Sequence, residues 1–315
     1  MRLLFGIGHP AHVHFFRNLI DILESQNHEI QICVNDRENV QQMLKLYEYS
    51  YEVYGNNHPN MHLKILDLLK YERYAYNKFT SFRPHLVLSI AHYFFGHVGK
   101  FLNVPSMYFT DTEDARLINS IGFPFADLIL TPSCFQGSVP LQKHISYNSY
   151  HELAYLHPDI FKPDPSVLHN LNVNEGDKFI LVRFSSWDSS HDIGHMGFKS
   201  LNERIQMIKE LEKYGKVFIT SEIDLPEDLH KNRCKISPEK IHDLLYYSQM
   251  YIGEGATLAS EAGVLGVPWV WISAGERRGY LDDQENHYGL GFSLDTPQAA
   301  LKKSIELLTK EITSI

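Results

Sequence analysis

Cysteine is scarce in this chain of 315 residues, which holds only Cys33, Cys134 and Cys234, far apart from one another. They form neither a CxxC pair nor the even set that a disulfide framework needs, so we expect reduced thiols in a cytoplasmic protein. Long apolar runs are missing too. None reaches the ~18 residues of a membrane-spanning helix. The first residues, MRLLFGIG, predict a buried strand rather than a signal peptide.

A net positive charge, metal-ligand clusters and the dinucleotide fingerprint are also missing. The formal net charge of −9 argues against a general nucleic-acid binder. His12 and His14 stand two residues apart, but no cysteine or acidic cluster accompanies them in sequence, so we expect no metal ion. The first glycine loop, GIGHPAH, is not GxGxxG, and the sequence therefore predicts no dinucleotide cofactor.

What is present is an ordinary globular composition over a length that suits two domains. Apolar residues make up 43% of the chain and charged residues 21%, as in soluble proteins. Regular periodicity is lost between Pro132 and Pro165, where prolines accumulate. We therefore place the boundary near residue 160, with one domain over residues 1–160 and a second over residues 161–315.

Apolar runs and helical spacing predict alternating strands and helices in both halves. The expected strands are Arg2–Ile7, Glu29–Val34, Leu86–Ile90, Ser106–Phe109 and, as the last of the first half, Asp127–Leu130, followed by Phe179–Phe184, Lys216–Thr220, Met250–Ile252 and Pro268–Ile272. The expected helices include Val13–Ser25, Arg37–Tyr49, Met61–Phe82, Leu201–Tyr214, one that starts at Ser237-Pro238, and a last one from Thr296-Pro297 to about Lys310. This alternation predicts an α/β fold with a parallel sheet in each domain.

The expected helix Met61–Phe82 mixes lysines and an arginine with tyrosines and leucines. A basic aromatic helix can lie on an anionic membrane surface, which would bring the protein to the inner face of the membrane as a peripheral partner. The alternative is a packed helix with a solvated basic face.

The most informative stretch is Gly253–Ser273, which predicts a strand, a glycine turn, a helix and a second strand. Leu258 and Ala262 lie on one face of that helix, Gly266 can end it, and Pro268 prevents its continuation. Such a unit places a helix N-terminus at the carboxyl end of a parallel sheet, where phosphates bind. The alternative is a βαβ unit whose small residues serve close packing.

The first strand ends in the glycine loop GIGHPAH, which leads into His12. An imidazole titrates near neutral pH, so His12 can act as general base toward an acceptor hydroxyl. The alternative is a loop histidine that caps the following helix or meets solvent. Asp111, after the strand Ser106–Phe109, leaves a similar choice between an acid/base or acceptor-binding residue and the N-cap of an acidic helix start.

The run GATLASEAGVLGVP resembles the donor-nucleotide motif of the GT-B superfamily, which includes the peptidoglycan N-acetylglucosaminyltransferase and the UDP-N-acetylglucosamine 2-epimerases. Within that superfamily, the whole chain most resembles an uncharacterised family of predicted glycosyltransferases. The resemblance implies two Rossmann-like domains that face each other across a cleft. It assigns the glycine turn to the donor phosphates, through Gly253, Gly255, Ala256 and Thr257, and Glu261 to the ribose.

Two further segments fall in the order of that superfamily. Arg183, Ser185 and Ser186 follow the first strand of the second half, in a loop that approaches the donor phosphates in GT-B proteins. Asp283 and Gln284 resemble the acidic-glutamine segment that holds the donor sugar. The loop that carries His12 resembles the one that approaches the acceptor.

These observations predict a metal-independent glycosyltransferase that uses a nucleotide sugar, UDP-linked by resemblance, and a sugar or lipid-linked acceptor of envelope polysaccharide or glycolipid synthesis. One alternative is a UDP-N-acetylglucosamine 2-epimerase. Against it, Ala91-His92 stands where epimerases carry an aspartate, and their histidine-arginine signature after the strand Phe179–Phe184 is absent. The other alternative is a nucleotide-sugar binder without catalysis.

Overall fold

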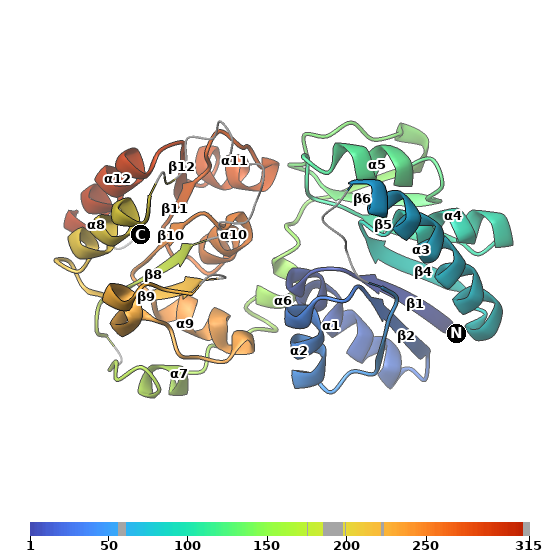
Figure 1. The fold of residues 1–315 in the computed structure, drawn as a ribbon, viewed down its shortest axis with the longest axis horizontal. Helices are drawn as coiled ribbons and strands as arrows, with labels where there is room; N and C mark the ends of the chain where they lie inside the picture. Colours follow the sequence, from blue (N-terminus) through green and yellow to red (C-terminus); the bar gives the residue numbers. More distant parts are fainter. Residues whose placement is uncertain (56–60, 175, 185–197, 199, 222–223, 311–315) are drawn as a thin grey trace. The chain divides into compact units, whose positions relative to one another are not determined.

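The computed structural model describes residues 1–55, 61–174, 176–184, 198, 200–221 and 224–310. The chain divides into two units, Met1–Tyr155 and Leu156–Ile315. Each unit is built on its own parallel β-sheet, and helices flank each sheet (Figure 1). Among the described residues, no helix is long and apolar enough to cross a membrane.

The first unit has a sheet of seven parallel strands in the order β3-β2-β1-β4-β5-β6-β7. The strands are β1 (Arg2–Ile7), β2 (Glu29–Val34), β3 (Tyr51–Val53), β4 (Leu86–Ile90), β5 (Ser106–Phe109), β6 (Leu128–Pro132) and β7 (His144–Tyr147). The helices are α1 (Pro10–Ser25), α2 (Glu38–Leu46), α3 (Met61–Phe82), α4 (Tyr93–Leu102) and α5 (Arg116–Gly122), with the short α6 (Leu153–Leu156) at the division between the units and a 3₁₀ turn at Leu141–Lys143.

The second unit has a sheet of five parallel strands in the order β12-β11-β10-β8-β9. They are β8 (Phe179–Phe184), β9 (Lys216–Ser221), β10 (Met250–Gly253), β11 (Trp269–Ile272) and β12 (Gly291–Leu294). The helices are α7 (Ser166–His169), α8 (Leu201–Leu211), α9 (Ile241–Tyr247), α10 (Ala256–Val264), α11 (Gly279–Asn286) and α12 (Pro297–Thr309), with 3₁₀ turns at Glu227–Asn232 and Pro238–Lys240.

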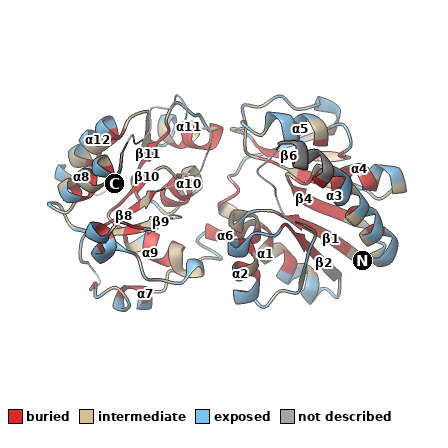
Figure 2. Ribbon diagram, viewed as in Figure 1, coloured by how far each residue is buried: buried red, intermediate tan, exposed pale blue. Residues whose placement is uncertain are grey.

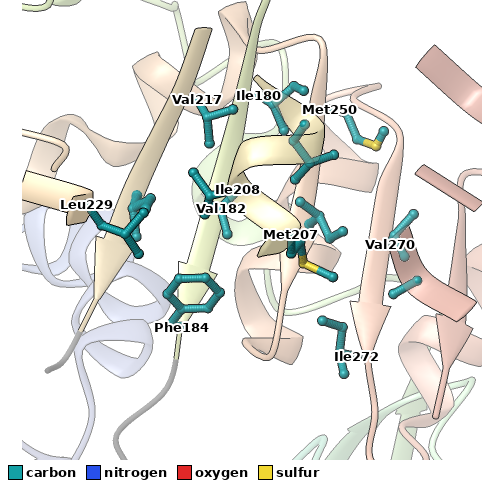
Figure 3. Packing of buried hydrophobic residues seen from close by; sticks show 14 of the residues in the cluster. Ile180, Val182, Phe184, Met207, Ile208, Val217, Leu229, Met250, Val270 and Ile272 are labelled. Atoms are coloured by element: carbon teal, nitrogen blue, oxygen red, sulfur yellow. The ribbon is translucent and has the colours of Figure 1, made fainter. Parts of the chain in front are cut away.

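The central strands are buried on both faces, as parallel strands covered by helices must be. In β1, Leu3, Phe5 and Ile7 pack on one side with residues of α1 and α2. Leu4, which points the opposite way, packs with residues of α3 and α4. Figure 2 shows this burial along the strands of both units. In the second unit, Figure 3 shows the side chains of β8 and β10 packed against Met207 and Ile208 of α8.

The expected α/β class with two Rossmann-like domains is confirmed, and most expected strands are present within a residue or two. Asp127–Leu130 as the last strand of the first half is wrong, because β7 follows β6 and forms the edge of the sheet. Residues of β7 are polar or only partly buried, so they produce no apolar run that a sequence could display. The short strands β3 and β12 were not expected either.

Two helix starts differ from the expected ones. The helix α1 begins at Pro10, three residues before Val13, and Nδ1 of His9 caps it by accepting a hydrogen bond from the Ala11 N–H at 3.2 Å. The proline occupies the first helical turn, where its missing N–H does no harm. At Ser237-Pro238 a three-residue 3₁₀ turn comes first, and α9 begins only at Ile241.

A buried polar network joins α10 to α11 in the second unit. The fully buried amide of Gln284 donates to Oγ of Ser260 at 2.9 Å, and its oxygen accepts from Nε1 of Trp269 at 3.0 Å. Gly263 lies directly against this network. A Cβ on Gly263 would stand 2.0 Å from the Gln284 oxygen and 2.8 Å from the Trp269 nitrogen. The glycine therefore provides the space in which the amide is satisfied.

We predict that Gly263→Ala lowers the free energy of unfolding by about 2–3 kcal/mol, since the added methyl group displaces a buried amide from its partners. The matched control is Gly96→Ala in α4, where the nearest atoms to a new Cβ lie 3.8 Å away. That change should be neutral or stabilise by up to about 1 kcal/mol through helix propensity. Urea unfolding followed by circular dichroism measures both, and equal effects would contradict the packing argument.

Candidate active site

In each unit the strand order reverses at one point of the sheet. In the second unit the reversal lies between β8 and β10, and Gly253 at the end of β10 pairs with Arg183 at the end of β8. In the first unit it lies between β1 and β4. Helices on opposite faces diverge at such a point, so the carboxyl ends of the two strands border a crevice in which ligands of α/β proteins bind.

The glycine turn Gly253–Gly255 lies closely on β8. A Cβ on Gly253 would stand 2.3 Å from the Arg183 carbonyl oxygen, and one on Gly255 would stand 2.9 Å from Cδ of Arg183. The Tyr251 hydroxyl secures the turn by donating to the Gly255 carbonyl at 3.0 Å. Both glycines are therefore needed for close approach, and they bring the turn against the Arg183 side chain.

The turn leads directly into α10, which begins at Ala256. Gly255 is the N-cap residue and, as a glycine, has no side chain with which to cap the helix. Ala256 and Thr257 occupy the first turn and are partly exposed. Backbone N–H groups of a first helical turn, with the positive end of the helix dipole, favour an anion. The expected positions of Gly253, Gly255, Ala256, Thr257 and Arg183 thus fall together at the reversal point of the second sheet.

Glu254 brings a negative charge into this turn, and Arg204 of α8 holds it. Nη2 of Arg204 lies 3.1 Å from both carboxylate oxygens of Glu254. The guanidinium also lies over the rings of Phe184 and Phe198, at 5.2 and 4.6 Å from their centroids. The pair offsets the charge of Glu254 next to a position suited to an anion. Sequence analysis missed Arg204, since nothing local connects it to the turn.

Glu261, expected to bind ribose, is 5% exposed and paired with His242 of α9. Oε1 of Glu261 lies 2.9 Å from Nε2 of His242. A ribose hydroxyl bound by this carboxylate would share it with the imidazole. His242 is a second residue that sequence analysis did not connect with the site.

The other residues that the sequence assigned to donor binding lie in different surroundings. Gln284, expected to hold the donor sugar, is buried in the network with Ser260 and Trp269, where its amide fixes α11 on α10. Asp283 is partly exposed, and its Oδ1 lies 2.5 Å from Nδ1 of His287. Ser185 and Ser186 lie outside the described residues.

In the first unit, His12 lies at the start of α1 beside the reversal point. Its Nδ1 accepts a hydrogen bond from the Gly8 N–H at 3.2 Å. Burial, together with the nearby His9 and His92, lowers the pKa of His12 well below its usual 6.5, although Asp111 acts in the opposite direction. His12 is therefore neutral at physiological pH, with its hydrogen on Nε2 and its lone pair engaged at Nδ1.

His92, at the start of α4, is almost completely buried. Burial lowers the pKa of His92 to about 4, and its Nδ1 lies 2.7 Å from the Ile90 carbonyl, to which it donates. The preceding residue, Ala91, has φ of +60°, a conformation that costs a non-glycine residue about 1 kcal/mol or more. This strain occurs at the reversal point, where it turns the backbone so that His92 faces β1.

Asp111 does not cap a helix, because α5 begins five residues later with Ala115 as N-cap and no side-chain cap bond. Its Oδ2 lies 3.0 Å from Nδ1 of His151, and its Oδ1 accepts from the Thr112 hydroxyl at 3.0 Å. His151 comes from the segment between β7 and α6, so the pairing joins distant parts of the chain. Sequence analysis missed His151, which stands in the stretch without periodicity.

Asp111 and His151 shift each other's pKa. Burial would raise the pKa of Asp111, but the charge and hydrogen bonds of His151, with Thr112 and His12, outweigh it and lower the pKa from 3.8 to about 2. Burial would lower the pKa of His151, but Asp111 and then Glu152 outweigh it and raise the pKa above its usual 6.5. A buried imidazole held by a carboxylate is an arrangement suited to proton transfer.

A family model described as "Protein of unknown function (DUF354)" matches residues 2–282. The uncharacterized protein MJ0665 of Methanocaldococcus jannaschii is 23% identical over 279 residues, which are 84% of this chain and 79% of the relative.

Solved structures share the fold over nearly the whole chain at low identity. A UDP-GlcNAc 2-epimerase from Neisseria meningitidis, bound to UDP-GlcNAc, gives a TM-score of 0.74 at 15% identity, covering 98% of this chain and 92% of the other. The UDP-GlcNAc 2-epimerase of Methanocaldococcus jannaschii, in complex with UDP-GlcNAc and UDP, gives 0.71 at 12%, covering 99% and 94%. The spinosyn rhamnosyltransferase SpnG, complexed with spinosyn aglycone, gives 0.58 at 14%, covering 98% and 91%. The fold is therefore of the GT-B type, as the motif resemblance implied.

We predict that the Asp111–His151 pair stabilises the fold most between about pH 4 and 6.5. The lowered pKa of Asp111 makes its contribution present above 3.8 and lost as pH falls toward about 2. The raised pKa of His151 makes its contribution present below 6.5 and lost as pH rises through the folded-state value.

A double-mutant cycle with Asp111→Asn and His151→Gln, measured by urea unfolding at pH 3, 5 and 9, isolates the pair from other titrating groups. The coupling should reach about 2 kcal/mol at pH 5 and fall at both extremes. A coupling that is the same at pH 5 and pH 9 would show that the ion pair is not formed.

Proposed function

The chain belongs to the DUF354 family, and we propose that it is a metal-independent glycosyltransferase that moves a sugar from a nucleotide-sugar donor to an acceptor hydroxyl. The observation that carries this proposal is the start of α10 at the reversal point of the second sheet, with Gly253 lying against the Arg183 backbone and Gly255 against its side chain. The N–H groups of a first helical turn and a guanidinium together suit a diphosphate.

In this proposal the N–H groups of Ala256 and Thr257, the Thr257 hydroxyl and Arg183 hold the diphosphate. The positive charge stabilises the leaving group as its bond to the sugar breaks, which in other sugar transferases is the task of a metal ion. Ser185 and Ser186, which follow β8 in sequence, are proposed to assist. Glu261 is proposed to accept the ribose hydroxyls while it remains paired with His242.

On the sugar side, Asp283 is the proposed partner of the donor hydroxyls, since it is partly exposed in the middle of α11. A UDP-linked donor is favoured because structural neighbours of this fold were solved with UDP-GlcNAc or UDP. The acceptor hydroxyl is proposed to belong to a sugar or lipid-linked sugar of envelope synthesis.

A second candidate is a UDP-GlcNAc 2-epimerase, favoured by the higher TM-scores of the epimerases than of the rhamnosyltransferase. Against it, His92 occupies the place of the aspartate that epimerases carry, and its pKa of about 4 keeps it neutral. A neutral buried imidazole that already donates to a carbonyl does not replace a carboxylate. The third candidate is a nucleotide-sugar binder without turnover.

We predict that one nucleoside diphosphate, UDP, raises the melting temperature in a panel that also contains GDP, CMP, dTDP, ADP and NAD. A ligand at ~100 times its dissociation constant adds about 2.7 kcal/mol to stability. Arg183→Gln should weaken UDP at least about tenfold but change uridine little, because it removes a charge partner of the phosphates only. The matched control is Arg233→Gln, an exposed arginine of the same unit that lies 3.8 Å from Asp224.

Several results would contradict this proposal. A shift with NAD alone would replace it by a cofactor-binding role, and no shift with any nucleotide would remove the donor site. An equal loss for UDP and uridine in Arg183→Gln would separate Arg183 from the phosphates. With the matching nucleotide sugar, release of nucleoside diphosphate only when an acceptor is present supports transfer, a C2 epimer formed without acceptor identifies an epimerase, and binding without either product identifies a silent binder.

A further inference from the structure

Only one of the two ring nitrogens of His151 has a partner within the described residues. Nδ1 lies 3.0 Å from Oδ2 of Asp111, a carboxylate, and therefore donates its hydrogen to it. Nε2 is buried and makes no hydrogen bond within the described residues. Buried polar atoms are nearly always paired, and an unpaired one requires an explanation such as a ligand or a catalytic role. In the neutral ring, Nε2 carries the lone pair.

His12 has the opposite arrangement. The Gly8 N–H donates to Nδ1 of His12, so the hydrogen of the neutral ring is on Nε2. This imidazole can donate a hydrogen bond to a ligand, but its lone pair is already used. His151 contributes to the lowered pKa of His12, and both histidines contribute to the lowered pKa of Asp111, so the three side chains form one cluster in the first unit.

We propose that His151, positioned by Asp111, is the general base that takes the proton from the acceptor hydroxyl, and that His12 instead donates its Nε2–H to the acceptor. This assignment rests on the glycosyl transfer proposed above, and it replaces His12 as the base expected from sequence. Asp111 becomes a positioning residue, since it acts through the imidazole.

The proposed step moves one proton and two electron pairs. The acceptor O–H bond breaks, its proton goes to Nε2 of His151, and the oxygen electron pair forms a bond to the anomeric carbon of the donor sugar. The bond between that carbon and the diphosphate oxygen breaks, and its electrons leave with the diphosphate. The imidazolium that results is stabilised by the Asp111 carboxylate at Nδ1.

The surroundings of His151 suit a ring held in one orientation. The Phe15 ring centroid lies 4.4 Å away, and the Tyr147 ring stacks at 6.3 Å. The titratable groups around it are Asp111, Glu152, Tyr147 and His12, and burial raises the pKa of Tyr147 so that it stays neutral. The His151 side chain is 9% exposed and its Nε2 is covered. In the proposed step the acceptor reaches Nε2 by displacing the atoms that cover it or through one bridging water.

The first test compares His151→Gln and His12→Gln with the intact enzyme, with UDP binding measured beside turnover. His151→Gln should lower kcat at least about 100-fold, the usual contribution of a general base, while the dissociation constant of UDP stays unchanged. His12→Gln should mainly raise KM for the acceptor. The matched control is His97→Gln, because His97 also pairs with a carboxylate, Glu72, at 2.6 Å, but lies between α3 and α5 away from the cluster.

The pH profile of kcat/KM distinguishes a positioning role of Asp111 from a purely structural one. With His151 as base, the acidic limb of kcat/KM should lie above 6.5 and disappear in His151→Gln. In Asp111→Asn the limb should move to lower pH, because the carboxylate that raises the pKa of His151 is gone. An acidic limb that persists in His151→Gln and disappears in His12→Gln overturns the proposal and restores His12 as base.

A second measurement does not require turnover or a folded variant. Nitrogen-15 NMR of the histidine rings of the intact protein should find the neutral tautomer with hydrogen on Nδ1 at His151 and on Nε2 at His12. Hydrogen on Nε2 in neutral His151 overturns the assignment even if the protein transfers sugar. The expected tautomers without turnover of any nucleotide sugar would instead mean that the proposed function has failed and the base has no reaction to serve.

Discussion

The close approach of the turn after β10 to the backbone of β8 is the constraint on which the candidate donor site depends. Parallel pairing brings Gly253 beside Arg183, and the space between them admits no Cβ. Because the turn lies this close, the first turn of α10 starts beside the Arg183 side chain. Removing the glycines would separate the two groups that together suit a diphosphate, so one packing requirement creates the chemistry of the site.

Three carboxylates of the candidate site are held by basic partners from other elements. Arg204 holds Glu254, His242 holds Glu261, and His151 holds Asp111. Such buried pairs contribute little net stability, since desolvation offsets much of the attraction, but they fix where charges point. In the second unit Arg204 offsets the charge of Glu254 next to a position suited to an anion. In the first unit the Asp111 carboxylate orients the imidazole of His151.

Sequence patterns predicted the fold and the donor turn better than they predicted the roles of single polar residues. The glycine turn, the helix α10 and the flanking strands were identified because each is encoded by neighbours within a few positions. Gln284 was assigned to a ligand from its place in a motif, yet the structure buries its amide against Ser260 and Trp269. A glutamine in a helix looks the same in sequence whether it faces a ligand or a tryptophan.

The sequence by itself determined the alternation of strands and helices, the burial of the strands on both faces, and the glycine turn at Gly253–Gly255, because hydrophobic period, glycine and proline act over short distances along the chain. Only the tertiary structure decided that His151 pairs with Asp111, that Glu254 meets Arg204, and that β7 completes the first sheet. These contacts join segments far apart in the chain, and no local pattern specifies which side chains parallel strands will bring to the same edge.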